Sequence, residues 1–256
     1  MRRFARTLLL LAAALLAQAQ DAVGVEERLG AQVPLDLVLK AEDGSPVRLG
    51  QLLGKPTILT LNYFRCAGIC TPLLNGVVEV VDRTQAVPGT EFQVLTVSFD
   101  GRDTPEIAAQ KRANYLAEIK RPMPAGAWRF LTGPDADTRA LADAVGFKFK
   151  REGEDFIHAG VIVFLSPNGR VTRYMYGTTF LPADLQMAVG EAARGEASPT
   201  ITKLLKICFN QDPAGRGYVF SATKAGAIVV VLLALGYVVY LVRPRRRTQP
   251  QSGESP

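Results

Sequence analysis

Apolar segments of strand type alternate with segments of helical periodicity between residues 56 and 195. The run Pro56–Phe64 is β-branched and apolar, and residues 73–81 have apolar side chains at helical spacing. The alternation continues through further strand and helix segments to an antiparallel hairpin, with its turn at Ser166–Gly169, and a last helix. Strands joined through helices predict an α/β fold, in which one sheet carries helices on its faces.

The two ends of the chain differ from this central part. Residues 1–19 combine three arginines, an apolar stretch and the small-residue pattern Ala17-Gln18-Ala19. This is typical of a secretory signal peptide that is cut after Ala19, with an uncleaved anchor as the alternative. Residues 225–242 contain no charged side chain, so they are long and apolar enough to cross a membrane. A buried core helix is the alternative for this second segment.

The charge distribution indicates how such a chain is oriented. The net charge is +6, and residues 1–19 and residues 243–256 account for all of it, with a net charge of +3 each. The region between is neutral, which argues against a nucleic-acid-binding protein. By the positive-inside rule, the arginines after residue 242 predict a cytoplasmic C-terminus. The main domain would then face the periplasm from the inner (cytoplasmic) membrane, in an oxidising compartment.

These features divide the chain into six expected segments. They are a signal peptide (1–19), a leader (20–33), the α/β domain (34–195), a linker with a short helix (196–224), a single transmembrane helix (225–242) and a cytoplasmic tail (243–256).

Two cysteines follow the first strand of the α/β pattern. Cys66 and Cys70 lie where a helix is expected to begin, and the N-terminus of a helix stabilises thiolate. Residues four apart share one helical face, so both sulfurs could reach one metal ion. A redox-active thiol pair and a structural disulfide remain open, because both form in an oxidising compartment.

The single histidine adds a third candidate ligand. His158 is expected to open the strand that starts the last hairpin, beside the cysteines. Two thiolates and one imidazole suit copper(I), and thiolate with imidazole also holds copper(II). Closed structural zinc sites take four ligands, so zinc fits this set less well. A lone histidine is also frequently an ordinary surface or core residue.

Four segments together resemble the Sco/SenC family of membrane-tethered copper chaperones, over roughly residues 34–210. They read CAGIC, VLTVSFDGRDTPE, WRFLTG…ALADAVGF and HAGVIVFLSPNGRVTRYMYG. The resemblance implies a thioredoxin-like fold, copper ligation by Cys66, Cys70 and His158, and an acidic position beside the site at Asp100. It also implies a metallochaperone rather than an enzyme. Its partner would be the copper A-bearing subunit of cytochrome c oxidase, or another thiol-containing assembly factor.

The chain departs from the family pattern in two respects. Thr71 separates Cys70 from Pro72, where family members commonly have proline directly after the second cysteine. The expected anchor is C-terminal, whereas many members are anchored at the N-terminus.

Other functions remain open. In a membrane-tethered thiol–disulfide oxidoreductase, Cys66 would attack and Cys70 would resolve the mixed disulfide. A redox or copper sensor that signals through the membrane helix is a further alternative. Cys208, the third cysteine, is expected to be a buried structural thiol, with an intermolecular disulfide as the alternative.

Overall fold

The computed structural model describes residues 23–66, 68–197, 209–211 and 218–220. The expected signal peptide, transmembrane helix and cytoplasmic tail lie outside these residues, as does Cys208. None of the helices within the described residues is long and apolar enough to cross a membrane.

The chain divides into two compact units, Met1–Thr200 and Ile201–Pro256. In the second unit, strands β12 (Phe209–Gln211) and β13 (Tyr218–Phe220) pair in antiparallel orientation. The candidate site and all features below belong to the first unit.

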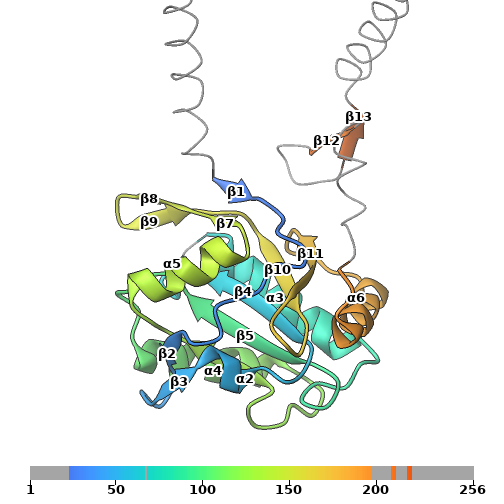
Figure 1. Cartoon of the computed structure of the whole chain (residues 1–256), viewed down its shortest axis with the longest axis horizontal. Coiled ribbons are helices and arrows are strands. Elements are labelled where there is room, and N and C mark those ends of the chain that lie inside the picture. The colour runs from blue at the N-terminus through green and yellow to red at the C-terminus, as the bar shows by residue number, and fades with distance from the viewer. Residues whose placement is uncertain (1–22, 67, 198–208, 212–217, 221–256) are drawn as a thin grey trace, which may run out of the picture. The chain divides into compact units, whose positions relative to one another are not determined.

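A five-stranded mixed sheet forms the centre of the first unit (Figure 1). Its strands lie in the order β11-β10-β4-β5-β6, so the order in space differs from the order in sequence. Strands β4 (Thr57–Asn62), β5 (Gln93–Ser98) and β6 (Trp128–Leu131) are parallel. Strands β10 (Val161–Leu165) and β11 (Val171–Tyr176) form the antiparallel hairpin, and β10 is also antiparallel to β4. The predicted mixed α/β fold is confirmed.

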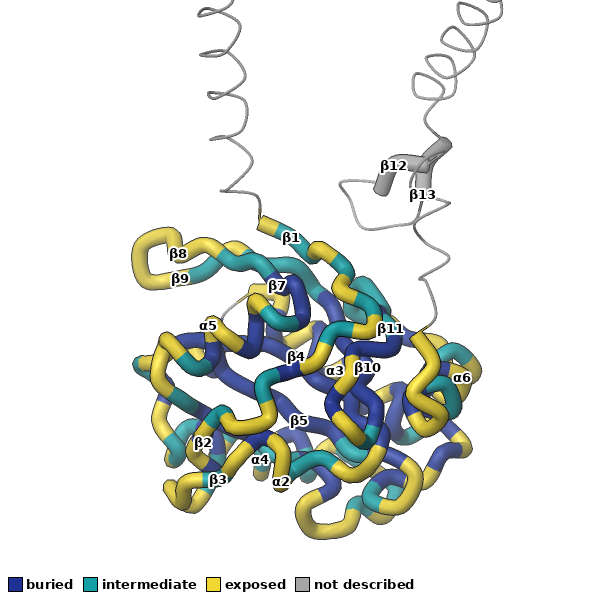
Figure 2. The backbone as a smooth tube through the Cα atoms, in the orientation of Figure 1, coloured by how far each residue is buried: buried dark blue, intermediate teal, exposed yellow. Residues whose placement is uncertain are grey.

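Helices cover both faces of the sheet. Helices α3 (Cys70–Arg83), α4 (Pro105–Glu118) and α6 (Pro182–Arg194) bury their apolar sides in one hydrophobic cluster. Helices α2 (Leu49–Leu52) and α5 (Asp135–Ala144) contribute to the cluster on the opposite face. The strands between them are buried along most of their length, as Figure 2 shows in dark blue. Burial on both faces explains why these strands read as continuous apolar runs rather than as alternating patterns.

Glycine is required where α3 passes the segment that follows β11. A Cβ atom added at Gly76 would lie 2.0 Å from the carbonyl oxygen of Thr178. Because Gly76 has no side chain, helix α3 can pack closely against that backbone segment. This close packing helps to position α3 and its first residue, Cys70.

Three small antiparallel pairs lie outside the central sheet. They are β1 (Gly24–Val25) with β7 (Phe147–Lys148), β2 (Val38–Lys40) with β3 (Pro46–Arg48), and β8 (Lys150–Glu152) with β9 (Asp155–Ile157). Residues 24 and 25, expected in a leader without pattern, thus join the unit. These short strands have too few alternating apolar residues to give a periodicity.

The strand directions bring three chain segments to one edge of the sheet. Strands β4 and β5 end at this edge because they are parallel. Strand β10 begins there, because it is antiparallel to β4 and its Ile162 lies opposite Thr60. Ligands of α/β sheets bind outside the carboxyl ends of the parallel strands, so this edge is where a site is expected.

Candidate metal centre

The two cysteines lie on a turn and at a helix start, rather than on one helix. After β4 the chain turns at Tyr63–Cys66, where the Cys66 N–H donates to the carbonyl oxygen of Tyr63 at 3.3 Å. Helix α3 begins at Cys70. The expectation that both sulfurs share a helical face is therefore wrong. The turn brings the Cys66 sulfur back over the helix start, where the Gly68 N–H donates to it at 3.3 Å.

His158 meets the cysteines from the other side of the site. It does not open a strand, as the sequence pattern predicted, but lies between the end of β9 and the start of β10. Its Nε2 atom is 3.2 Å from the sulfur of Cys70. One ligand atom each from Cys66, Cys70 and His158 lie within 4.8 Å of one another. A metal bound about 2.3 Å from each sulfur holds its ligands at separations of this size.

The imidazole of His158 is oriented by its surroundings. Its Nδ1 atom is 3.1 Å from the carbonyl oxygen of Ala159, which fits a tautomer with the proton on Nδ1. In that tautomer the lone pair of Nε2 points at the cysteines. The rings of Tyr63, Phe99 and Phe147 surround the imidazole at centroid distances of 5.9, 5.3 and 5.8 Å. Burial lowers the pKa of His158, although the contact with the Ala159 carbonyl opposes this shift, so the metal-binding neutral form is favoured.

The two thiols differ in acidity. Burial would raise the pKa of Cys66, but hydrogen bonds from the Cys70 thiol, the Tyr63 hydroxyl and the backbone N–H groups of Cys70 and Gly68 outweigh it. The pKa of Cys66 is therefore below its ordinary value. Burial raises the pKa of Cys70, and the neighbouring Cys66 adds to this shift. Cys66 is thus the first of the pair to become a thiolate.

We expect iodoacetamide to label Cys66 before Cys70 in the reduced, metal-free protein near neutral pH, since the thiolate is the nucleophile. The Cys66 rate should already be high at pH values below the ordinary thiol pKa of about 8.5. Peptide mass spectrometry over a pH series separates the two sites from Cys208. Faster labelling of Cys70 would contradict this order, and a Cys66→Ser variant is the control for cross-labelling.

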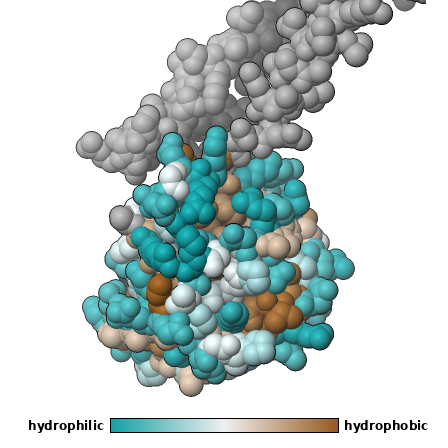
Figure 3. All heavy atoms as spheres, turned by 90° about the vertical axis from the view of Figure 1, so that its left-hand side faces the viewer, coloured by the Kyte–Doolittle hydropathy of each residue, from teal (hydrophilic) through white to brown (hydrophobic). Residues whose placement is uncertain are grey.

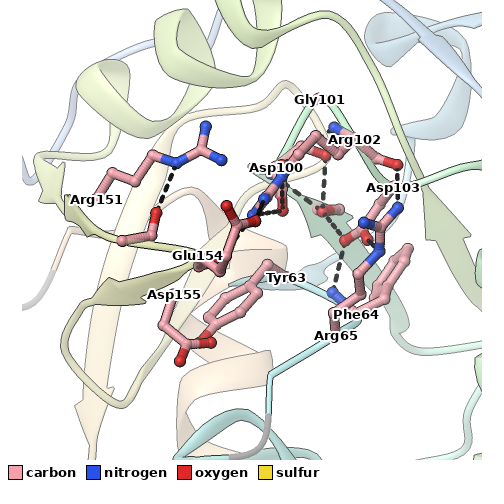
Figure 4. Close-up of polar contacts among 12 residues, drawn as sticks. Tyr63, Phe64, Arg65, Asp100, Gly101, Arg102, Asp103, Arg151, Glu154 and Asp155 are labelled. Atoms are coloured by element: carbon pink, nitrogen blue, oxygen red, sulfur yellow. Dashed lines mark hydrogen bonds and ion pairs between the residues drawn. The ribbon is translucent and has the colours of Figure 1, made fainter.

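Asp100 lies near the site but is engaged elsewhere. Its residue is only 2% exposed, and both carboxylate oxygens accept hydrogen bonds from the guanidinium of Arg102 (Figure 4). Burial would raise the pKa of Asp100, but hydrogen bonding with Arg102 and its positive charge outweigh this, so the pKa is lowered. Asp100 follows Phe99, whose ring contacts His158. Asp100 is therefore connected to His158 through Phe99 rather than by direct contact.

Sequence reasoning missed two contributors to this site. Tyr63 packs against His158 and contributes to the lowered pKa of Cys66, while its hydroxyl donates to the carboxylate of Asp155 at 3.3 Å. Arg102 binds Asp100. An aromatic residue at the end of an apolar strand was the available signal for Tyr63. Arg102 gives no such signal, because an arginine in a polar turn is typical of a solvated loop.

Comparisons with known proteins find similar sequences and similar folds. The SCO1/SenC family model matches residues 26–192. Comparison with curated proteins finds no match. Among solved structures, a protein from Aquifex aeolicus VF5 that is named as a candidate electron transfer protein is 32% identical. That match has a TM-score of 0.59 and covers 66% of this chain and 96% of that chain.

Two more distant structures share the fold. Arabidopsis thaliana ScoI, solved with copper bound, is 22% identical, with a TM-score of 0.51 over 65% of this chain and 99% of that chain. BsSco, described as a member of the Sco family of cytochrome c oxidase assembly proteins, is 23% identical. Its TM-score is 0.51 over 66% of this chain and 97% of that chain. Since the family model matches more than half of the sequence, this chain belongs to the SCO1/SenC family.

Proposed function

We propose that this protein is a metallochaperone that binds copper through Cys66, Cys70 and His158. The observation that carries the proposal is the convergence of these three ligand atoms within 4.8 Å at one edge of the sheet. Two sulfurs and one imidazole nitrogen form a soft ligand set that suits copper(I), and thiolate with imidazole also accommodates copper(II). Three ligands rather than four make a closed structural zinc site the poorer fit.

Copper is the cargo in this proposal. The receiving protein would be the copper A-bearing subunit of a respiratory cytochrome c oxidase, which is consistent with the assembly role stated for BsSco. Thiolates of the receiver replace the ligands of this protein one at a time, so copper changes partners without being released. The early deprotonation of Cys66 and the neutral imidazole of His158 prepare two of the three ligands for binding.

The proposal is tested by titrating the reduced full-length protein with copper(I) against a competing chelator. We expect one copper per chain in the wild type and none held at this site in a Cys66→Ser/Cys70→Ser double variant. Cys208→Ser is the matched control and should bind as the wild type does. Retention of the wild-type stoichiometry by the double variant would rule out the site.

We further propose that residues 225–242 tether the protein to the inner membrane, with the copper site on the periplasmic side. The charge pattern of the sequence supports this topology. Protein for the titration should therefore be recovered from membranes with detergent. Recovery in the soluble fraction after cell disruption would contradict the tether.

A second candidate function is thiol–disulfide exchange, which the unequal thiol pKa values favour. A thiolate at Cys66 could attack a partner disulfide, and Cys70 could then resolve the mixed disulfide, leaving the partner reduced and Cys66–Cys70 oxidised. That chemistry has no need of His158, so the histidine separates the two functions.

A further inference from the structure

We propose that Arg102 is a positioning residue, which ties the β8–β9 hairpin, and with it His158, to the end of strand β5. The inference rests on the proposed function, because it concerns how the segment that carries His158 is held at that same site. We call this segment, residues 154–158, the histidine arm.

The hairpin needs such an attachment. Among the described residues, strands β8 and β9 pair only with each other and form a sheet separate from the central one. All three residues of β8 are exposed, as are Gly153 and Glu154 in the turn. The side of the molecule that carries the hairpin is mainly hydrophilic, with small apolar areas (Figure 3). Burial of apolar surface therefore contributes little at the hairpin tip, and polar contacts there carry more weight.

Arg102 makes two contacts with the hairpin turn. Its Nη2 atom donates to the carbonyl oxygen of Glu154 at 2.8 Å, and its Nη1 atom donates to the Glu154 carboxylate. Figure 4 shows the guanidinium between the turn and Asp100. His158 is four residues along the chain from Glu154 and directly follows β9, the strand that begins after this turn.

The opposite side of the guanidinium is fixed by a buried carboxylate. The Nε atom of Arg102 lies 2.9 and 3.0 Å from the two oxygens of Asp100, and Nη2 lies 2.8 Å from one of them. Asp100 is anchored in turn, because its N–H donates to the Ser98 hydroxyl at 3.1 Å. The planar guanidinium can bind Asp100 and Glu154 at the same time, whereas a lysine ammonium could not reproduce this geometry.

The loop of residues 98–103 also holds the segment that ends at Cys66, residues 63–66, which we call the cysteine arm. The carboxylate of Asp103 accepts from the Phe64 N–H and from the Ser98 hydroxyl, both at 2.6 Å. Arg65, next to Cys66, donates to the carbonyl oxygen of Arg102 at 2.6 Å. Residues 98–103 therefore contact the segment before Cys66 on one side and the segment before His158 on the other. Both arms of the site are positioned relative to one loop.

The base of the hairpin has independent support. The ring of Phe156 packs against those of Tyr63, Phe99 and Phe149, at 5.2, 5.3 and 5.8 Å. Loss of Arg102 should therefore loosen the tip and the histidine arm while the aromatic cluster keeps the unit folded.

The test compares Arg102→Met with Arg151→Met in the full-length protein. Arg151 is the matched control, because its described polar contact, with the Gly153 carbonyl, lies within the hairpin, and it lies over the Phe156 ring of the same hairpin. Hydrogen exchange is measured first, without metal. We expect amides of residues 150–157 to exchange about 10- to 100-fold faster in Arg102→Met, as expected from the loss of charged hydrogen bonds. Arg151→Met should stay near the wild type.

Copper(II) binding is the second measurement. Loss of a group that orients a ligand typically costs about 10- to 100-fold in metal affinity, and we expect a loss in this range for Arg102→Met, with an altered copper(II) EPR spectrum. Arg102→Lys should behave like Arg102→Met, because it cannot bridge both carboxylates. If Arg102→Met does not fold, the double variant Asp100→Asn/Arg102→Met is used in both measurements instead. The Asp100→Asn substitution removes the buried charge of Asp100, which would otherwise be left without Arg102.

The outcomes separate the two proposals. Unchanged hairpin exchange in Arg102→Met would overturn the positioning role, whatever the copper result. Faster exchange in a protein whose wild type binds no copper would support the role of Arg102 while overturning the proposed function. Equal loosening in Arg151→Met would also overturn the role, because any charge removed from the hairpin region would then have the same effect.

Discussion

Replacing His158 by alanine should reduce the affinity for copper(II) by more than about 100-fold. This is more than the usual cost of losing a residue that only orients a metal ligand. The reason is the loss of a ligand atom that already lies 3.2 Å from the Cys70 sulfur. Affinity for copper(I) should fall less, because two thiolates remain and copper(I) favours soft sulfur ligands. Competition titrations of both oxidation states, with wild type and variant side by side, measure the difference.

The same variant separates the two candidate functions. Reduction of a partner disulfide by Cys66 and Cys70 should continue in His158→Ala, since that reaction uses only the thiols. Wild-type copper(II) affinity in this variant would contradict the metal site and favour the oxidoreductase. Cys208→Ser is the control, because it shows whether the third cysteine contributes to copper binding.

The central sheet could be predicted because its strands are buried on both faces. The segment Thr57–Asn62 is fully buried, and α3 follows it with apolar residues at helical spacing. The small hairpin Lys150–Ile157 could not be predicted in the same way. Its β8 residues are charged and exposed, so its structure depends on contacts with residues far away in sequence, such as Arg102.

The candidate site was predictable in its members but not in its geometry. The spacing of Cys66 and Cys70 and the uniqueness of His158 identified the ligand types. A spacing of four suggested one helical face, yet the structure uses a turn before α3, where the backbone conformation places the Cys66 sulfur. The position of His158 before β10 depends on the hairpin, which the sequence pattern did not show.

Phe99→Ala should lower the free energy of unfolding of the metal-free first unit by about 3–5 kcal/mol, the usual cost of removing a buried aromatic ring. Phe99 is 2% exposed and its ring contacts those of Tyr63, Phe149 and His158 at centroid distances of 5.7, 4.3 and 5.3 Å. A cavity at this position would remove packing on both arms of the candidate site. Urea unfolding, followed by fluorescence of Trp128, the single tryptophan, reports on this unit alone.

Two controls make the Phe99 result specific. Phe99→Leu keeps most of the side-chain volume and should cost less than Phe99→Ala. Phe156→Ala should also cost less, because Phe156 is only partly buried and lies on the hairpin. An unfolding free energy within about 1 kcal/mol of the wild type for Phe99→Ala, with an unchanged denaturant slope, would contradict the prediction. It would mean that the cluster around His158 closes over the cavity, and that the imidazole is held by the hairpin contacts of Arg102 rather than by packing against Phe99.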